Sequence, residues 1–160
     1  MTPACHFCDR LARLGELPAG ELVWQFPHSV ALLGPWQYYH GYCVLVARAH
    51  AAELHRLPDD DRRGVFDELC LLARAVEAGF RPRKLNCELL GNQVPHPHWH
   101  LFPRYESDPN RLQAVWLDIA RAESDPAERR RLSTGPIHRA ETAALIRRHL
   151  ESQMRDDATA

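Results

Sequence analysis

The feature that most constrains this chain is a short row of histidines within residues 91–104. His96, His98 and His100 occupy alternate positions in this stretch. Successive side chains of a β-strand point to opposite faces, so a strand would place all three imidazoles on one face of a sheet. A helix would spread them around its circumference and would not accommodate Pro97 in its interior. The row therefore predicts a strand lined on one face by imidazoles.

The residues between the histidines predict where this strand lies in the fold. Trp99 and Leu101 would point away from the imidazoles, and we expect Trp99 to belong to the core. Pro95, Pro97 and Pro103 have no N–H group to donate to a neighbouring strand. The prolines therefore predict an edge strand, or the end of one.

A row of imidazoles is compatible with several kinds of chemistry. One imidazole can attack phosphorus while its neighbour donates a hydrogen bond to a phosphate oxygen. The row can also bind one catalytic zinc ion, since histidine nitrogen is a common zinc ligand. Three solvated surface histidines are a further interpretation, but the apolar residues between them are not typical of an exposed surface.

A second motif lies near the N-terminus, where Cys5 and Cys8 form a Cys-x-x-Cys pair. Two thiolates at this spacing can share a zinc ion, although a complete site needs two further ligands. A thioredoxin-like redox pair would belong near a βαβ pattern, which the sequence lacks. Two incidental cysteines are the remaining interpretation.

The rest of the pattern predicts an α+β fold with a mostly antiparallel sheet of about five strands. Besides the histidine strand, we expect strands over residues 22–26, 30–33, 42–47 and 84–90. A long helix over residues 59–80 would follow Pro58 and carry its acidic first turn at the positive end of the helix dipole. Its apolar stripe would consist of Val65, Phe66, Leu69, Leu72, Ala73 and Val76.

Residues 111–160 differ from the first 110 residues, because they are rich in charged side chains and poor in β-branched ones. We expect a helical C-terminal extension packed on the domain formed by residues 1–110, with the last six residues disordered. A helix over 137–154 would turn Ala140, Ala144, Leu145 and Leu150 inward. Trp116 would dock the extension back onto the domain, and we expect the extension to shape or cover the substrate cleft.

Length and charge exclude several classes of function. A chain of 160 residues with a formal net charge of −1 predicts one domain without the basic footprint of a nucleic-acid-binding protein. The arginines at 129–131 are read as a solvated helix face. No apolar run approaches the ~20 residues that span a membrane, and the N-terminus lacks the pattern of a signal peptide. We therefore expect a cytoplasmic protein with no nucleic-acid or membrane partner.

The histidine row also resembles a known family signature. The segment His96-Pro-His98-Trp-His100-Leu-Phe, followed by Pro-Arg-Tyr at 103–105, is similar to the histidine-triad (HIT) motif. The segment from Gly41 to His50 resembles the strand-plus-histidine segment of the same family. The resemblance implies a homodimer joined through the long helix and an edge strand. It also implies a nucleotide hydrolase or transferase that acts on nucleoside phosphoramidates or dinucleoside polyphosphates.

The resemblance implies roles for individual residues. His98 would be the nucleophile that forms a covalent nucleotidyl-histidine, and His100 would donate to the phosphate oxygens. His96 would join this catalytic network. Asn92 and Gln93 stand where many members carry Gln and then Ser or Thr, so they would contact the phosphate or the leaving group. A nucleotide-binding regulatory module with little turnover is the alternative.

Some members of the family hold a structural zinc ion. Carried onto this sequence, its ligands would be Cys5, Cys8, His50 and His96, a Cys₂His₂ set with no open position. His6 and His28 are alternative ligands. No organic cofactor is implied.

Overall fold

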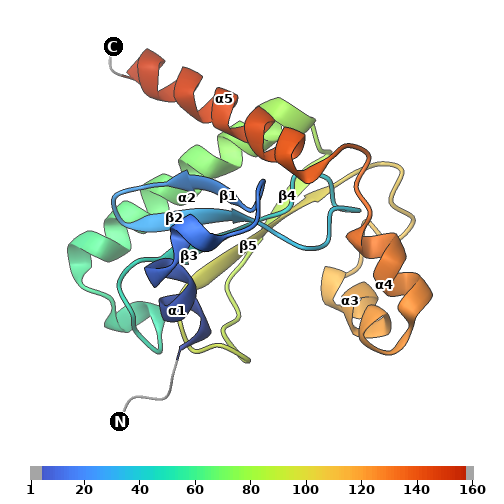
Figure 1. Cartoon of the computed structure of the whole chain (residues 1–160), viewed down its shortest axis with the longest axis horizontal. Helices are drawn as coiled ribbons and strands as arrows, with labels where there is room; N and C mark the ends of the chain where they lie inside the picture. The colour runs from blue at the N-terminus through green and yellow to red at the C-terminus, as the bar shows by residue number, and fades with distance from the viewer. Residues whose placement is uncertain (1–4, 158–160) are drawn as a thin grey trace.

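The centre of the fold is a five-stranded sheet in which every neighbouring pair of strands is antiparallel. We describe it from a computed structural model, in which residues 5–157 are placed well enough for description. The strand order is β1-β2-β3-β5-β4, as Figure 1 shows. The strands are β1 (Leu22–Gln25), β2 (Ser29–Leu33), β3 (Cys43–Ala47), β4 (Lys84–Glu88) and β5 (His98–Arg104).

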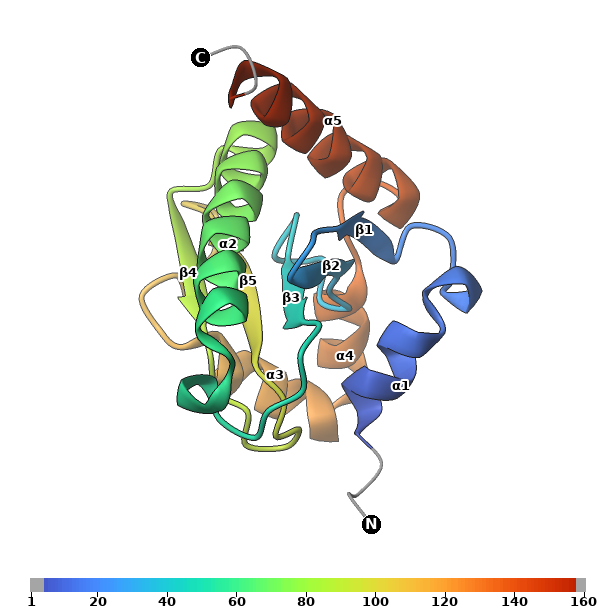
Figure 2. The same ribbon diagram turned by 90° about the vertical axis from the view of Figure 1, so that its left-hand side faces the viewer.

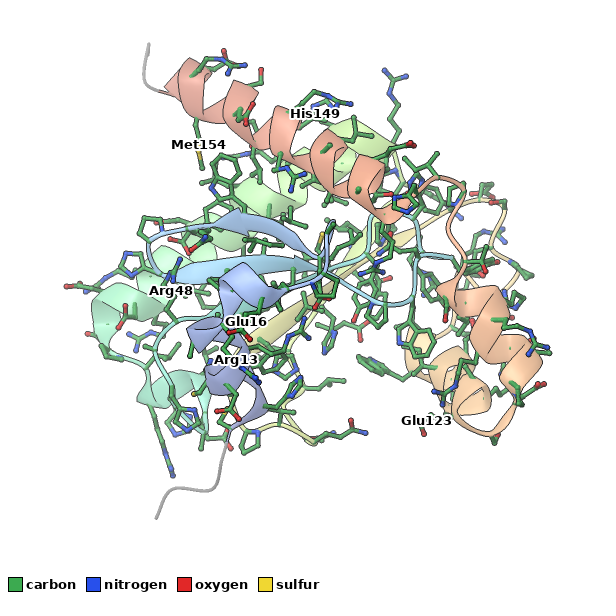
Figure 3. All side chains as sticks on the ribbon, viewed as in Figure 1. Arg13, Glu16, Arg48, Glu123, His149 and Met154 are labelled. Carbon is green, nitrogen blue, oxygen red and sulfur yellow. The ribbon has the colours of Figure 1, made fainter. Side chains whose placement is uncertain are left out.

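Helices cover both faces of this sheet, which confirms the expected α+β class. One face packs on α2 and α5, and the other on α1, α3 and α4 (Figure 2). Met154 points from α5 towards the sheet (Figure 3). The α-helices are α1 (His6–Ala12), α2 (Asp59–Phe80), α3 (Val115–Ser124), α4 (Pro126–Ser133) and α5 (Arg139–Asp157), and the short 3₁₀ turns are Leu14–Glu16 and Leu54–Arg56. None of the helices in residues 5–157 is long and apolar enough to cross a membrane.

The histidine strand is not at the edge of the sheet, so the expected edge position was wrong, whereas Pro97 and Pro103 do lie at the ends of the strand. β5 pairs with β3 on one side and with β4 on the other. The prolines are tolerated because of where they fall along the strand. Pro97 precedes β5, and Pro103 lies beyond Leu101, the last residue of β5 that pairs with β3. Pro97 still pairs with β3 through its carbonyl, which accepts from the Ala47 N–H, and the Ala47 carbonyl accepts from the His96 ring in place of the missing N–H.

The long helix begins and ends where it was expected, but Phe66 is not part of its buried stripe. The Phe66 side chain is 42% exposed and touches only the edge of the core, with its ring 5.7 Å from that of Trp99. The buried side of α2 is instead completed by Ala75 and by Glu68, which accepts hydrogen bonds from the His28 N–H and the Ser29 hydroxyl at the start of β2.

The last helix is rotated relative to the expected stripe. Ala140, Ala144 and Leu145 are only half-buried, because α5 packs against β1 as well as α2 and so turns a different side inward. Its buried side chains are Thr142, Ala143, Ile146 and Leu150. The helix continues through Asp157, so residues 155–157 are ordered, and the remaining residues expected to be disordered, 158–160, lie outside the described part.

The C-terminal segment completes the two cores. Val115 and Leu132 are fully buried against the face that carries the histidines. Ile146 and Leu150 are fully buried in the core on the opposite face, with α2. Removing this segment would expose both layers, so it is part of the packing that holds the sheet.

Candidate functional site

The strand β5 presents its histidines on the face opposite α2, as the alternation predicted. His98 lies beside Val46 of β3 and His100 beside Val44, and the two imidazole centroids are 4.9 Å apart. Trp99 and Leu101 point to the other face and belong to the core with α2. His98 is only 6% exposed and His96 1%, which excludes the interpretation of a solvated row.

His98 is held in one tautomer by the backbone. Its Nδ1–H donates to the carbonyl oxygen of His96 at 2.6 Å, which leaves the lone pair of Nε2 free. Burial lowers the pKa of His98, and the hydrogen bond to His96 offsets only part of that effect. Phe7 of α1 packs on the ring at a centroid distance of 4.6 Å. The structure therefore presents a neutral imidazole with an available nitrogen.

His100 is held by a tyrosine. The hydroxyl of Tyr42 lies 2.7 Å from Nδ1 of His100. Burial lowers the pKa of His100 to about 4, and the neighbouring His98 adds to the effect, so the ring is neutral at pH 7. A hydroxyl that donates to Nδ1 keeps the proton of a neutral imidazole on Nε2. His98 and His100 then play opposite parts, one with a free lone pair and one with an N–H group.

Gly34 is required for this arrangement. A Cβ atom at position 34 would lie 2.2 Å from the Tyr42 ring, closer than any real contact. Here the Tyr42 ring fills that space, which gives a physical reason for the glycine.

His96 turns away from the other two histidines. Its Nε2–H donates to the carbonyl oxygen of Ala47 at 2.7 Å, so Nδ1 is the nitrogen with the free lone pair. Nδ1 lies 3.4 Å from the Cys5 sulfur, 3.7 Å from the Cys8 sulfur and 3.1 Å from Nδ1 of His50. Three polar neighbours are more than one lone pair can satisfy by hydrogen bonding, whereas a shared cation would satisfy all of them.

The four side chains form one cluster, with all ligand atoms within 4.8 Å of one another. Bonds of ~2.0–2.3 Å at tetrahedral angles would separate the ligand atoms of a zinc site by about 3.3–3.8 Å. The Cys8 sulfur is 3.4 Å from Nδ1 of His50, and the His96 contacts fall close to the same range. Cys5, Cys8, His50 and His96 therefore fit a closed metal site.

The alternative ligands and the alternative zinc site are not supported by the geometry. Within residues 5–157, His6 and His28 are not part of the cluster, and His28 instead bonds to Asp61. His98 and His100 are also not part of it, so the row does not form a single metal site. The sharing of one zinc ion by His96, His98 and His100 was therefore the wrong alternative.

Asn92 and Gln93 lie at the entrance to the histidines. Both side chains are exposed, and both line a recess of about 250 Å³ together with Phe7, His98 and Trp116. The chain turns into this loop at Gly91, whose φ of +74° is in the region that favours glycine. The loop thus brings two amide side chains beside His98.

Three residues of this site were not found from the sequence. Tyr42 directly precedes β3. It lies two residues before Val44, so strand alternation would have placed both side chains on the histidine face. Phe7 sits between the two cysteines and gave no separate signal. Glu88 is the cross-strand partner of His100, a pairing that requires the strand register to be known.

An antiparallel five-stranded sheet with alternate histidines on an inner strand is the architecture of histidine triad proteins. The family model described as "HIT domain" matches residues 16–107, and the chain belongs to this family. The sequence is 29% identical over 117 residues to the protein called "Protein hit" of Bacillus subtilis, covering 70% of this chain and 78% of that one.

Two further relatives are informative. An adenosine 5′-monophosphoramidase of Saccharomyces cerevisiae is 26% identical over 102 residues, which is 63% of each chain. The crystal structure of a zinc-bound histidine triad family protein from Mycobacterium smegmatis superposes with a TM-score of 0.67 at 19% identity. That superposition covers 96% of this chain and 97% of the other, so the shared fold includes the C-terminal helices.

Proposed function

We propose that the protein is a nucleotide hydrolase or nucleotidyl transferase that acts at the α-phosphate of nucleoside phosphoramidates or dinucleoside polyphosphates. The family contains such enzymes, and the yeast relative is named as an adenosine 5′-monophosphoramidase. The observation that carries the proposal is the hydrogen bond from Nδ1–H of His98 to the His96 carbonyl. It leaves Nε2 as an uncharged nucleophile beside a second imidazole.

The reaction would proceed in two displacements. Nε2 of His98 attacks the α-phosphorus, a P–N bond forms, and the bond to the leaving group breaks with its electron pair. The leaving group is protonated by water. Water or another acceptor then attacks the same phosphorus, loses a proton, and releases His98. Nε2–H of His100 would donate to a phosphate oxygen in both steps, which stabilises the charge that develops there.

Asn92 and Gln93 would form hydrogen bonds with the leaving group. They line the recess that opens beside His98, and their amides can both donate and accept hydrogen bonds. Nothing in this role requires a charged side chain, which fits a leaving group that varies between an amine and a nucleotide.

The cluster of Cys5, Cys8, His50 and His96 would hold a structural zinc ion. Zinc there would tie the start of α1, which carries Cys5 and Cys8, to His50 in the loop after β3 and to His96 just ahead of β5. When bound, the ion would cross-link these segments, and the reaction proposed above assigns it no step. His96 has a second task, because its carbonyl orients His98.

A homodimer is the proposed assembly. β4 is an outer strand of the sheet, and α2, which packs on the same sheet, leaves Phe66 42% exposed. Pairing of two β4 edges with contact between two α2 helices would cover this surface. The cytoplasmic location and the lack of a nucleic-acid partner stay predictions.

The experiment is a turnover assay on adenosine and guanosine phosphoramidates, diadenosine polyphosphates and a nucleotide sugar. The native protein is compared with His98→Ala, and with His55→Ala as a control at an exposed histidine outside the site. Turnover that vanishes only in His98→Ala, with an acid-labile nucleotide adduct seen by intact mass, supports the proposal. Turnover that survives in His98→Ala contradicts it. Tight nucleotide binding without turnover of any substrate favours the regulatory module.

A further inference from the structure

The C-terminal segment places an aromatic side chain directly against the histidine row. Trp116, at the start of α3, packs edge-to-face on His100, with ring centroids 4.9 Å apart and an interplanar angle of 83°. The same half-buried indole lines the recess of about 250 Å³ that also contains His98, Asn92 and Gln93. Trp116 is thus part of the wall beside the reacting groups.

The orientation of the indole is fixed by Glu88. The Nε1–H of Trp116 donates to the Glu88 carboxylate, and Glu88 is the partner of His100 across β4 and β5. This hydrogen bond uses the only polar group of the indole. What Trp116 offers to the recess is therefore apolar ring surface, which can pack on a ligand but cannot donate a hydrogen bond to it.

The helix that carries Trp116 is itself anchored by buried polar contacts. The guanidinium of Arg104, at the end of β5, donates to the Asp108 carboxylate and to the carbonyls of Asn110 and Gln113. Further along, the hydroxyl of Tyr39 donates to Asp118 of α3 at 2.9 Å.

Arg104, Asp108, Tyr39 and Asp118 are all almost fully buried. Their contacts hold the segment between β5 and α3 in one conformation against the sheet. Trp116 is therefore in place before a ligand arrives, and packing on it costs little loss of side-chain freedom.

We propose that Trp116 is a specificity-determining residue that favours substrates whose leaving group carries a planar aromatic ring. The inference rests on the proposed function, because it assigns the recess to the leaving group of that reaction. A ring in the recess would pack against the indole, while Asn92 and Gln93 serve the polar part of the same group. An amine or alkyl leaving group would use the amides alone.

The test compares two adenosine phosphoramidates that share the nucleotide and the scissile bond. One has an N-benzyl group and the other an N-cyclohexylmethyl group, so they differ in aromaticity at similar size. We expect the native protein to prefer the benzyl compound in kcat/KM by about five- to tenfold, as aromatic pairs allow. Trp116→Leu should reduce this ratio to about one, whereas Leu117→Ala, at an exposed neighbour on the same helix, should leave it unchanged.

The ratio separates selectivity from damage to the site. Loss of His100 support in Trp116→Leu would lower both rates equally and leave the ratio intact, and that result would overturn the proposal. Calorimetric binding of the same two compounds is measured in parallel. If neither compound is turned over, that result counts against the proposed function alone. The proposal for Trp116 is then decided by the ratio of the two binding affinities, and equal affinities of the native protein for the two compounds would refute it.

Discussion

The substitution Tyr42→Phe tests whether a single hydroxyl sets the role of His100. Tyr42 is 2% exposed, and its hydroxyl is 2.7 Å from Nδ1 of His100. The substitution keeps the ring, which stacks on Phe102 at 4.0 Å, and removes only the hydrogen bond. Burial also raises the pKa of Tyr42, so the hydroxyl is protonated and able to donate.

The size of the effect is bounded by what His100 itself contributes. A donor that stabilises a developing anion is worth roughly 10²–10³ in kcat, and this sets the ceiling for losing His100 altogether. Without Tyr42, the proton of His100 is no longer confined to Nε2, and a neutral hydrogen bond contributes about 0.5–1.5 kcal/mol to that preference. We therefore expect kcat to fall by about three- to tenfold, with KM nearly unchanged.

The matched control is Tyr39→Phe. Tyr39 is also buried and its hydroxyl also makes one hydrogen bond, but to Asp118 and not to a histidine. Both variants should lose about 1–3 kcal/mol of unfolding free energy, because each leaves a buried group without its partner. Steady-state kinetics on an adenosine phosphoramidate separate them. A kcat for Tyr42→Phe equal to that of the native protein would refute the tautomer argument and leave Tyr42 a purely structural residue.

Three further predictions concern the metal cluster and the packing of α2. A strong chelator should lower the melting temperature of the native protein by about 5–10 °C, because bound metal stabilises only the folded state. The melting temperature of Cys8→Ser should not change with chelator. Equal melting curves of the native protein with and without chelator would contradict the zinc proposal. Gly64→Ala gains ~1 kcal/mol of helix propensity. Its Cβ would, however, lie 2.1 Å from the His28 ring, so we expect a net loss of about 1 kcal/mol in urea unfolding, and a gain would show that the ring moves freely. The hydrogen bond to Asp61 raises the pKa of His28, so its contribution is present below the unfolded pKa of ~6.5 and is lost as the pH rises through the folded pKa. Asp61→Asn should therefore cost more stability at pH 5.5 than at pH 8.5, and a cost independent of pH would exclude this linkage.

The sequence pattern was sufficient to predict the structure where the contacts that determine it lie between residues close together in the chain. Alternation placed His98, His100 and Trp99 on their correct faces, and the acidic first turn located the start of α2. The same reasoning placed β5 at an edge because it weighed the prolines without knowing the register. Pairing of β5 with β3 joins residues more than fifty positions apart in the chain, and no local signal encodes that choice.

In the site, too, some features could be predicted from the sequence, and others depend on contacts between distant residues. The four metal-cluster residues were grouped correctly through the family resemblance, because their spacing alone left two ligands unassigned. The contacts of Trp116 with Glu88 and of Tyr39 with Asp118 depend on how α3 folds back over β5. They join side chains that have no periodic relation, so only the three-dimensional arrangement reveals them.

The metal cluster also has a consequence for the order of events during synthesis. His96 follows Cys5 by 91 residues in the chain, so the thiols of Cys5 and Cys8 are synthesised well before it. At about 5–20 residues per second, the two thiols wait roughly 5–20 s for their last partner. During that interval they are open to oxidants and to competing metal ions. The proposed zinc site can therefore close only after His96 has been synthesised, and the two thiols are exposed to these reactions until then.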